Sequence, residues 1–180
     1  MKRVLIGGIG NVLLADDGVG PYVARLIDAT YEFDRGVEVA DLGTPALDLI
    51  DQISGRDAVI LIDSVDSGAT PGTVLLYRRE DIVKHMPSIR MDPHSPALVE
   101  TLLSAELFAE CPKEFLLVGI TGDSYEAECG LTVGVHWSIR LAIAEVLGEL
   151  DRLGVKYKKR ARPRAVDIWW EKDVETLAHV

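Results

Sequence analysis

The sequence has few of the residues that mark secreted or membrane-spanning proteins. It contains only two cysteines, Cys111 and Cys129, and their spacing matches no metal or redox motif. Such cysteine usage fits a reducing compartment better than a disulfide-stapled secreted domain. No apolar run approaches the ~20 residues that a membrane span needs, and the start "MKRVLIGGIGN" indicates a first strand rather than a signal peptide. We therefore expect a cytoplasmic protein with no membrane partner.

Positive charge is also scarce. The chain has 19 Lys and Arg against 29 Asp and Glu, a formal net charge of −10, which argues against nucleic acid as a partner. Six of these basic residues lie in residues 155–164 ("VKYKKRARPR"), a segment without any acid. A solvated tail is the favoured interpretation of this segment, and a docking element is the other one.

Hydrophobic residues are abundant, at 48% of the 180 residues. This length and composition are typical of one domain with a sizeable core. We expect an α/β domain over residues 1–154 and a C-terminal extension, first basic and then tryptophan-containing, over 155–180. Trp169 and Trp170 are expected to pack on this chain rather than on a partner. A monomer is the expected state.

Short apolar runs alternate with helical patterns along the chain. Strands are predicted from runs of apolar and branched residues, at 3–8, 37–43, 57–63 and 114–120. Helices are predicted from capping residues and apolar spacing, from Pro21, from Thr44 as N-cap with Pro45 at N1, over about 95–107 and over about 132–153. This alternation predicts a mainly parallel sheet between two layers of helices.

One predicted strand, at 73–79 ("TVLLYRR"), breaks the parallel pattern. Only the short loop "SVDSGATPG" separates it from the strand before it. A parallel crossover needs a dozen or more residues, usually with a helix, so this strand should run antiparallel. The expected fold is a three-layer αβα sandwich of the phosphorylase/hydrolase-like kind, with a twisted sheet of about five strands.

Residues 8–21 ("GIGNVLLADDGVGP") have the glycines of a phosphate-binding loop without its chemistry. A dinucleotide loop needs a third glycine where Leu13 stands, and a Walker loop needs a lysine that this segment lacks. Asp16 and Asp17 would also repel a phosphate from the following helix N-terminus. A single acid there would be interpreted as a helix cap. With two acids, one can cap while the other points into the crevice above the sheet.

Topology brings further candidates to that crevice. Ligands of open α/β sheets bind beyond the carboxyl ends of the strands, where the strand order reverses. If the order begins 2-1-3, Asp63 lies at this edge in "LIDSVD", with Asp66 just past it. "PHSP" places His94 before a helix whose N-terminus faces the same edge. Together, Asp17, Asp63 and His94 suit a borderline divalent ion such as Zn²⁺ or Ni²⁺.

Five motifs in order match a known family. They are "GIGNVLLADDGVG" from residue 8, "DLGT" at 41–44, "LIDSVD" at 61–66, "PHSP" at 93–96 and "GLT" at 130–132. On these motifs the chain, from about residue 2 to 153, resembles the hydrogenase maturation endopeptidases. Family members often carry a proline just after the strand predicted at 114–120, where this chain reads "GITGDSYEAECG".

The resemblance implies an endopeptidase that removes the C-terminal extension of a nickel–iron hydrogenase large-subunit precursor after nickel insertion. It places the catalytic and metal-contacting residues on Asp17, Asp63 and His94, and substrate contacts on Gly43 and Thr44. The implied cofactor is Ni²⁺ presented by the precursor, with Zn²⁺ or another divalent ion as a surrogate. The implied chemistry is metal-assisted hydrolysis of a peptide bond.

Two alternatives stay open at this point. One is a zinc peptidase that keeps its own metal and cuts other peptides. The other is a noncatalytic nickel-binding or assembly module that only docks on the precursor. The general base is open as well, with Asp16 and Asp66 as the candidates.

Overall fold

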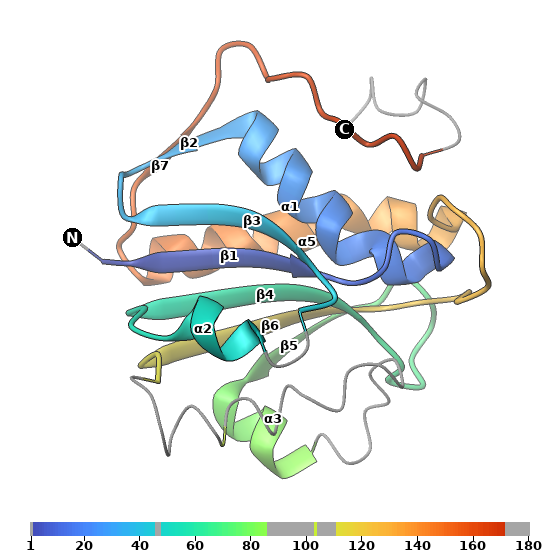
Figure 1. Ribbon diagram of the computed structural model, residues 1–180, viewed down its shortest axis with the longest axis horizontal. Coiled ribbons are helices and arrows are strands. Elements are labelled where there is room, and N and C mark those ends of the chain that lie inside the picture. The colour runs from blue at the N-terminus through green and yellow to red at the C-terminus, as the bar shows by residue number, and fades with distance from the viewer. Residues whose placement is uncertain (1, 46–47, 86–102, 104–110, 172–180) are drawn as a thin grey trace.

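The computed structural model describes residues 2–45, 48–85, 103 and 111–171. Figure 1 shows a sheet with helices on both of its faces. The strands of this sheet are β1 (Val4–Ile9), β3 (Val37–Gly43), β4 (Ala58–Val65), β5 (Val74–Arg78) and β6 (Glu114–Thr121). The helices are α1 (Val19–Thr30), α2 (Leu49–Ile53), α3 (Arg79–His85) and α5 (Val133–Arg152), with a short 3₁₀ helix, η1 (Ala15–Gly18). In the described part of the chain, no helix is long and apolar enough to cross a membrane.

The sheet has the strand order β3-β1-β4-β6-β5. β1 pairs in parallel with β3 and β4, and β4 pairs in parallel with β6, whereas β5 pairs with β6 in the antiparallel direction. The predicted three-layer fold is therefore confirmed, including the antiparallel strand at 73–79. The order also reverses between β1 and β4, the first and third predicted strands, so a ligand is expected beyond their carboxyl ends.

Two apolar clusters, one on each face of the sheet, hold the layers together. Successive residues of a strand point to opposite faces. Ile60 of β4 accordingly belongs to the cluster of α1 and α5 with Ile27. Its neighbour Leu61 packs with Ile53 of α2 and Ile82 of α3. β4 is buried along its whole length because helices cover both of its faces.

Helix α1 begins in close contact with the ends of β1 and β4. A Cβ atom on Gly20 would lie 2.2 Å from the carbonyl oxygen of Ile9 and 2.3 Å from that of Ile62. A Cβ atom on Gly8 would lie 2.2 Å from the carbonyl oxygen of Gly20. Only glycine fits at these two positions without displacing backbone. The glycines of the loop therefore let η1, which carries Asp17, pack against β4.

A two-stranded antiparallel ribbon, which the sequence patterns do not predict, joins distant parts of the chain. It pairs β2 (Tyr31–Phe33) with β7 (Tyr157–Lys159). Beyond β7 the backbone amide of Arg160 donates to the carbonyl oxygen of Thr30 at 2.8 Å. The amide of Arg164 donates to the end of α1 as well. The basic segment is thus attached to the domain and not a solvated tail.

The tryptophans at the end of the described chain differ in burial. Trp170 is 3% exposed and belongs to the core cluster of α1 and α5. Its ring lies under the guanidinium of Arg25, at 4.8 Å. Trp169 is 64% exposed. The expected packing on this chain is therefore confirmed for Trp170 alone, and the boundary expected at residue 154 stays a prediction.

Two helices predicted from the sequence differ from the described elements or lie outside them. The helix expected from Thr44 begins only at Leu49, so Thr44 is not its N-cap. Gly43 ends β3 in the left-handed region, with φ of +57°, and the chain turns there. The helix forms where Leu49 and Ile53 are buried in the core. The helix expected at about 95–107 lies outside the described residues, apart from residue 103.

Candidate active site

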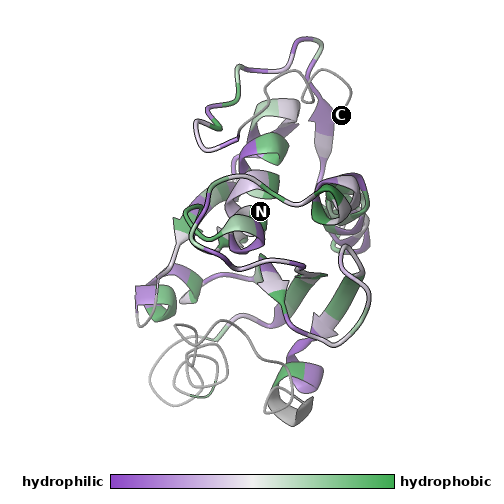
Figure 2. Cartoon of the chain, turned by 90° about the vertical axis from the view of Figure 1, so that its right-hand side faces the viewer, coloured by the Kyte–Doolittle hydropathy of each residue, from purple (hydrophilic) through white to green (hydrophobic). Residues whose placement is uncertain are grey.

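Two carboxylates of the predicted site lie at the carboxyl edge of the parallel strands, onto which Figure 2 looks. Asp17 lies in η1 and is 3% exposed; Asp63 lies near the end of β4 and is 4% exposed. A buried carboxylate is costly unless hydrogen bonds compensate it. The amide of Asn11 donates to Oδ2 of Asp17 at 2.6 Å, and the amide of Ser64 donates to Oδ1 of Asp63 at 2.8 Å. Each carboxylate is therefore oriented by a neighbouring backbone amide.

The third predicted metal contact, His94, lies outside the described residues. Within the described part of the chain, no three His, Cys, Asp or Glu residues are grouped as a metal site. The chemistry of the two described donors suits a divalent ion, because carboxylate oxygens are ligands for both Zn²⁺ and Ni²⁺. A divalent ion held by these two carboxylates would need further ligands.

Gly43, a predicted substrate contact, lies next to the glycine loop. It pairs with Ile9 at the end of β1, and its carbonyl oxygen accepts the amide of Gly10 at 2.8 Å. Nothing lies within 4 Å of a Cβ atom built on Gly43, so this backbone borders open space. Thr44 follows directly and is exposed. The "DLGT" segment and the loop that carries Asp17 thus meet at one edge of the sheet.

Asp16 has a structural role that differs from the predicted cap of α1. It is fully buried, and η1 and α1 have no side-chain cap. Oδ1 of Asp16 accepts the amide of Thr132 at 2.7 Å, and Oδ2 accepts the hydroxyl of Thr132 at 2.8 Å. The amides of Asp123 and Ser124 donate to Oδ2 at 2.9 and 3.0 Å. Asp16 therefore ties η1 to the β6–α5 loop and to Thr132, the N-cap residue of α5.

The backbone of η1 is joined to the same loop. The amide of Ala15 donates to the carbonyl oxygen of Glu128 at 2.7 Å, and that of Asp16 donates to Ser124 at 3.1 Å. Ala15 has a φ of +44°, in the left-handed region that residues with a Cβ atom rarely adopt. Because such a conformation persists only when the surroundings over-determine it, the β6–α5 loop helps to set the position of Asp17.

Tyr125, in that loop, reaches back to β4. Its hydroxyl oxygen lies 2.9 Å from Oγ of Ser64, and either of the two hydroxyls can be the donor. A Cβ atom on Gly122 would lie 2.5 Å from this hydroxyl. Burial raises the pKa of the Tyr125 phenol; the hydrogen bonds from Ser64 and Gly122 lower it, and the carboxylates of Asp66 and Asp17 raise it further. The phenol is therefore a neutral group close to two acids.

Sequence reasoning did not identify Tyr125. The available signal is the segment "GITGDSYEAECG", which differs from the family pattern in lacking a proline. Nothing in that segment indicates which side chain contacts β4, because Ser64 and Tyr125 are 61 positions apart. Their contact depends on the pairing of β4 with β6, in which Ser64 is opposite Ile120.

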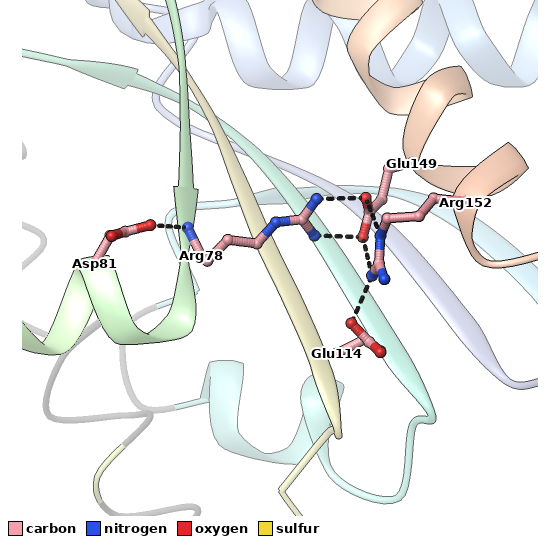
Figure 3. A network of polar contacts seen from close by, with 5 residues as sticks. All are labelled: Arg78, Asp81, Glu114, Glu149 and Arg152. Atoms are coloured by element: carbon pink, nitrogen blue, oxygen red, sulfur yellow. Dashed lines mark hydrogen bonds and ion pairs between the residues drawn. The ribbon is translucent and has the colours of Figure 1, made fainter.

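Figure 3 shows a polar network at the opposite edge of the sheet, where β6 begins. Glu149 of α5 is 4% exposed and accepts both terminal nitrogens of Arg78, at 2.6 and 2.8 Å. Arg152 donates to Glu149 and also to Glu114. Burial acts to raise the pKa of Glu149, but the two arginines outweigh it and lower the pKa to about 2. This network joins α5 to β5 and β6, so its role is structural.

Comparison with known proteins identifies the family and the fold. The sequence profile of the family HycI, hydrogenase maturation protease, matches residues 21–149. The chain is 32% identical over 155 residues to the hydrogenase 2 maturation protease of Escherichia coli, covering 86% of this chain and 94% of that protein. It is 34% identical over 161 residues to the hydrogenase expression/formation protein HupD of Rhodobacter capsulatus, covering 89% and 77%.

Solved structures similar to this one come from the same family of proteins. The hydrogenase maturating endopeptidase HybD of Escherichia coli superposes with a TM-score of 0.82 at 31% identity, over 88% of this chain and 98% of that chain. The nickel–iron hydrogenase maturation protease HybD of Thermococcus kodakarensis superposes with a TM-score of 0.65 at 25% identity, over 82% and 98%. The shared fold and the names of these relatives define an α/β protease. Within that class, the chain belongs to the hydrogenase maturation protease family.

Proposed function

We propose that this protease removes the C-terminal extension of a nickel–iron hydrogenase large-subunit precursor after nickel has been inserted. One observation carries the proposal. Asp17 and Asp63 are buried carboxylates at the edge where the strand order reverses, in a chain whose relatives are named for hydrogenase maturation. The precursor is the proposed partner. A cytoplasmic location and a monomeric state stay predictions from the sequence.

The nickel ion belongs to the substrate in this proposal. The cysteines of the precursor hold it, and Asp17, Asp63 and His94 contact it. Such an ion polarises the scissile carbonyl or lowers the pKa of a bound water molecule. Zn²⁺ or another divalent ion can serve as a surrogate, because carboxylate and imidazole ligands accept several borderline ions. A precursor without nickel then lacks part of the active centre, which makes cleavage dependent on correct loading.

In this proposal, residues of this chain hold the reacting groups in place. Backbone amides orient the Asp17 and Asp63 carboxylates, as outer hydrogen bonds commonly orient metal ligands. Gly43, which borders open space, and the exposed Thr44 are proposed to contact the extended substrate. Asp66 is exposed just past β4 and is the proposed general base. Asp16 is assigned a structural role and not a catalytic one, because four hydrogen bonds hold its carboxylate.

Intact-mass spectrometry of a nickel-loaded precursor tests the proposal. Incubation with the protein should lower the precursor mass by that of one C-terminal peptide. An unchanged mass would overturn the proposal and identify a docking module. Metal analysis of the purified protease adds a second criterion, because a stoichiometric, tightly held zinc ion would instead indicate a peptidase with its own metal.

A further inference from the structure

We propose that the hydroxyl of Tyr125 donates a hydrogen bond to the carbonyl oxygen of the scissile peptide bond, and that Ser64 holds this hydroxyl in position. The inference rests on the proposed function, because it assigns a catalytic residue to that cleavage. It adds a neutral donor beside the acids Asp17, Asp63 and Asp66.

Tyr125 lies beside the end of β4. Its hydroxyl lies 2.9 Å from Oγ of Ser64, the residue that follows Asp63 on β4. The loop beside it is fixed, since the amides of Asp123 and Ser124 both donate to the buried Asp16 carboxylate. Tyr125 is therefore held at the strand ends by its own contact and by its neighbours.

The phenol of Tyr125 can donate a hydrogen bond to a substrate. A phenol has one proton to donate and accepts hydrogen bonds on its oxygen. When Ser64 donates the hydrogen that it shares with Tyr125, the phenol oxygen accepts that hydrogen and the proton of the phenol is left for another partner. The residue is 41% exposed, so a substrate can approach this side chain.

Hydrolysis of a peptide bond needs a hydrogen-bond donor for the carbonyl oxygen. The amides of Asp123 and Ser124 would be natural donors to a carbonyl oxygen, but Asp16 already accepts both. During hydrolysis, water adds its oxygen to the carbonyl carbon, and negative charge develops on the carbonyl oxygen. The C–N bond then breaks, with the protons of the water passing to the new carboxyl group and amine. Tyr125 keeps its proton throughout and stabilises the developing charge, as oxyanion-hole donors do.

Kinetics of the Tyr125→Phe variant on nickel-loaded precursor test the assignment. Phenylalanine keeps the ring and removes only the hydroxyl. We expect kcat to fall by about 10²-fold, the typical effect of losing one oxyanion donor. KM and the dissociation constant from calorimetry should stay within about twofold, because the interaction forms only in the transition state. A kcat within about threefold of wild type, or a raised KM with unchanged kcat, would overturn the proposal.

A matched control and a double-mutant cycle separate catalysis from loss of structure. Tyr157→Phe makes the same change on β7, where the hydroxyl donates to Asp151 at 3.2 Å, and should leave kcat unchanged. Ser64→Ala should lower kcat by about tenfold, because the phenol loses its orienting partner. The Ser64→Ala and Tyr125→Phe double variant should be no slower than Tyr125→Phe alone. A multiplicative loss in the double variant would overturn the assigned role of Ser64.

The outcomes distinguish this inference from the proposed function. If the wild-type protein leaves nickel-loaded precursor uncut, both the proposed function and the role of Tyr125 are overturned. If the wild-type protein cuts it and Tyr125→Phe cuts it equally fast, only the role of Tyr125 is overturned.

Discussion

Asp16 accepts two hydrogen bonds from Thr132, one from its backbone amide and one from its hydroxyl, although the two residues are 116 positions apart. Asp17, the next residue in the chain, accepts the amide of Asn11 within its own loop. Adjacent acids therefore have different partners. Asp16 holds the β6–α5 loop, while Asp17 is oriented at the strand ends. The two residues should respond differently to the same substitution.

Asp16→Asn is expected to destabilise the fold. The amide NH₂ group of asparagine would face hydrogen-bond donors that now point at a carboxylate oxygen. Hydrogen bonds to a charged group contribute about 1.5–3 kcal/mol each, so a loss of about 2–4 kcal/mol is expected. A chain of this size loses ~2–4 °C of Tm per kcal/mol, which circular dichroism during heating measures. An unchanged Tm would contradict the structural role of Asp16.

Asp17→Asn is expected to abolish cleavage of nickel-loaded precursor and to leave the fold intact. Asparagine keeps the size of the side chain but removes the negative charge that the proposed nickel contact requires. Mass spectrometry of the precursor and a Tm measurement together check this prediction. Asp34→Asn, in the exposed turn between β2 and β3, is the control and should cleave normally. Full processing by Asp17→Asn would remove Asp17 from the site.

The network around Glu149 predicts a pH dependence of stability. Its pKa in the folded protein is about 2, below the ordinary value of 4.5. The folded state therefore favours the ionised form, and the contribution to stability is complete above about pH 4.5. It is lost as the pH falls from there toward about 2. Urea unfolding at a series of pH values should show this loss.

Substitution identifies Glu149 as the source of that loss. Glu149→Gln should lower the free energy of unfolding at pH 7 by about 1–3 kcal/mol, and its difference from wild type should shrink as the pH falls below 4.5. Glu145→Gln makes the same change one turn earlier in α5 and should alter little at either pH. A difference between wild type and Glu149→Gln that is constant from pH 7 to 3.5 would contradict the depressed pKa.

Trp170 and Trp169 form a matched pair for testing the C-terminal segment. Trp170→Ala removes a ring that is 3% exposed and that lies under Arg25, whereas Trp169 is 64% exposed. Buried Trp→Ala changes cost about 3–5 kcal/mol in cores, so Trp170→Ala should lower Tm and speed trypsin cleavage within residues 155–164. Trp169→Ala should leave both nearly unchanged. Equal effects of the two changes would contradict this difference in packing.

Strand patterns and loop length were enough to predict the sheet. β4 is mostly apolar because helices cover both faces, and the eight residues between β4 and β5 are too few for a parallel crossover. The order β3-β1-β4 then follows from the usual arrangement of open α/β sheets. These inferences succeed because they depend on local sequence patterns and on a common arrangement of strands.

Contacts between distant segments were not predictable in the same way. β2 and β7 have three residues each, too short for a periodic pattern, and their partners are more than 120 positions apart. The bonds from Thr132 to Asp16 likewise depend on where the β6–α5 loop folds back. The start of α2 was wrong because a good N-cap pair, Thr44 and Pro45, does not outweigh burial of Leu49 and Ile53.

The roles of the predicted site residues stay predictions. Asp17 and Asp63 are both buried at the predicted edge, and Gly43 borders it, while His94 lies outside the described residues. The sequence identified these residues through strand ends and family motifs. It left Asp16 as a candidate cap or general base and did not predict its bonds to the β6–α5 loop, because those donors lie more than 100 positions away in the sequence.

The most direct measurement of the central claim compares nickel-loaded and nickel-free precursor under identical conditions. Each is incubated with the wild-type protein and with Asp17→Asn, and the intact masses are recorded over time. The account predicts loss of the C-terminal peptide only from loaded precursor and only with the wild-type protein. Equal cleavage of both precursors by the wild-type protein would contradict it, because nickel in the substrate would then have no part in the reaction.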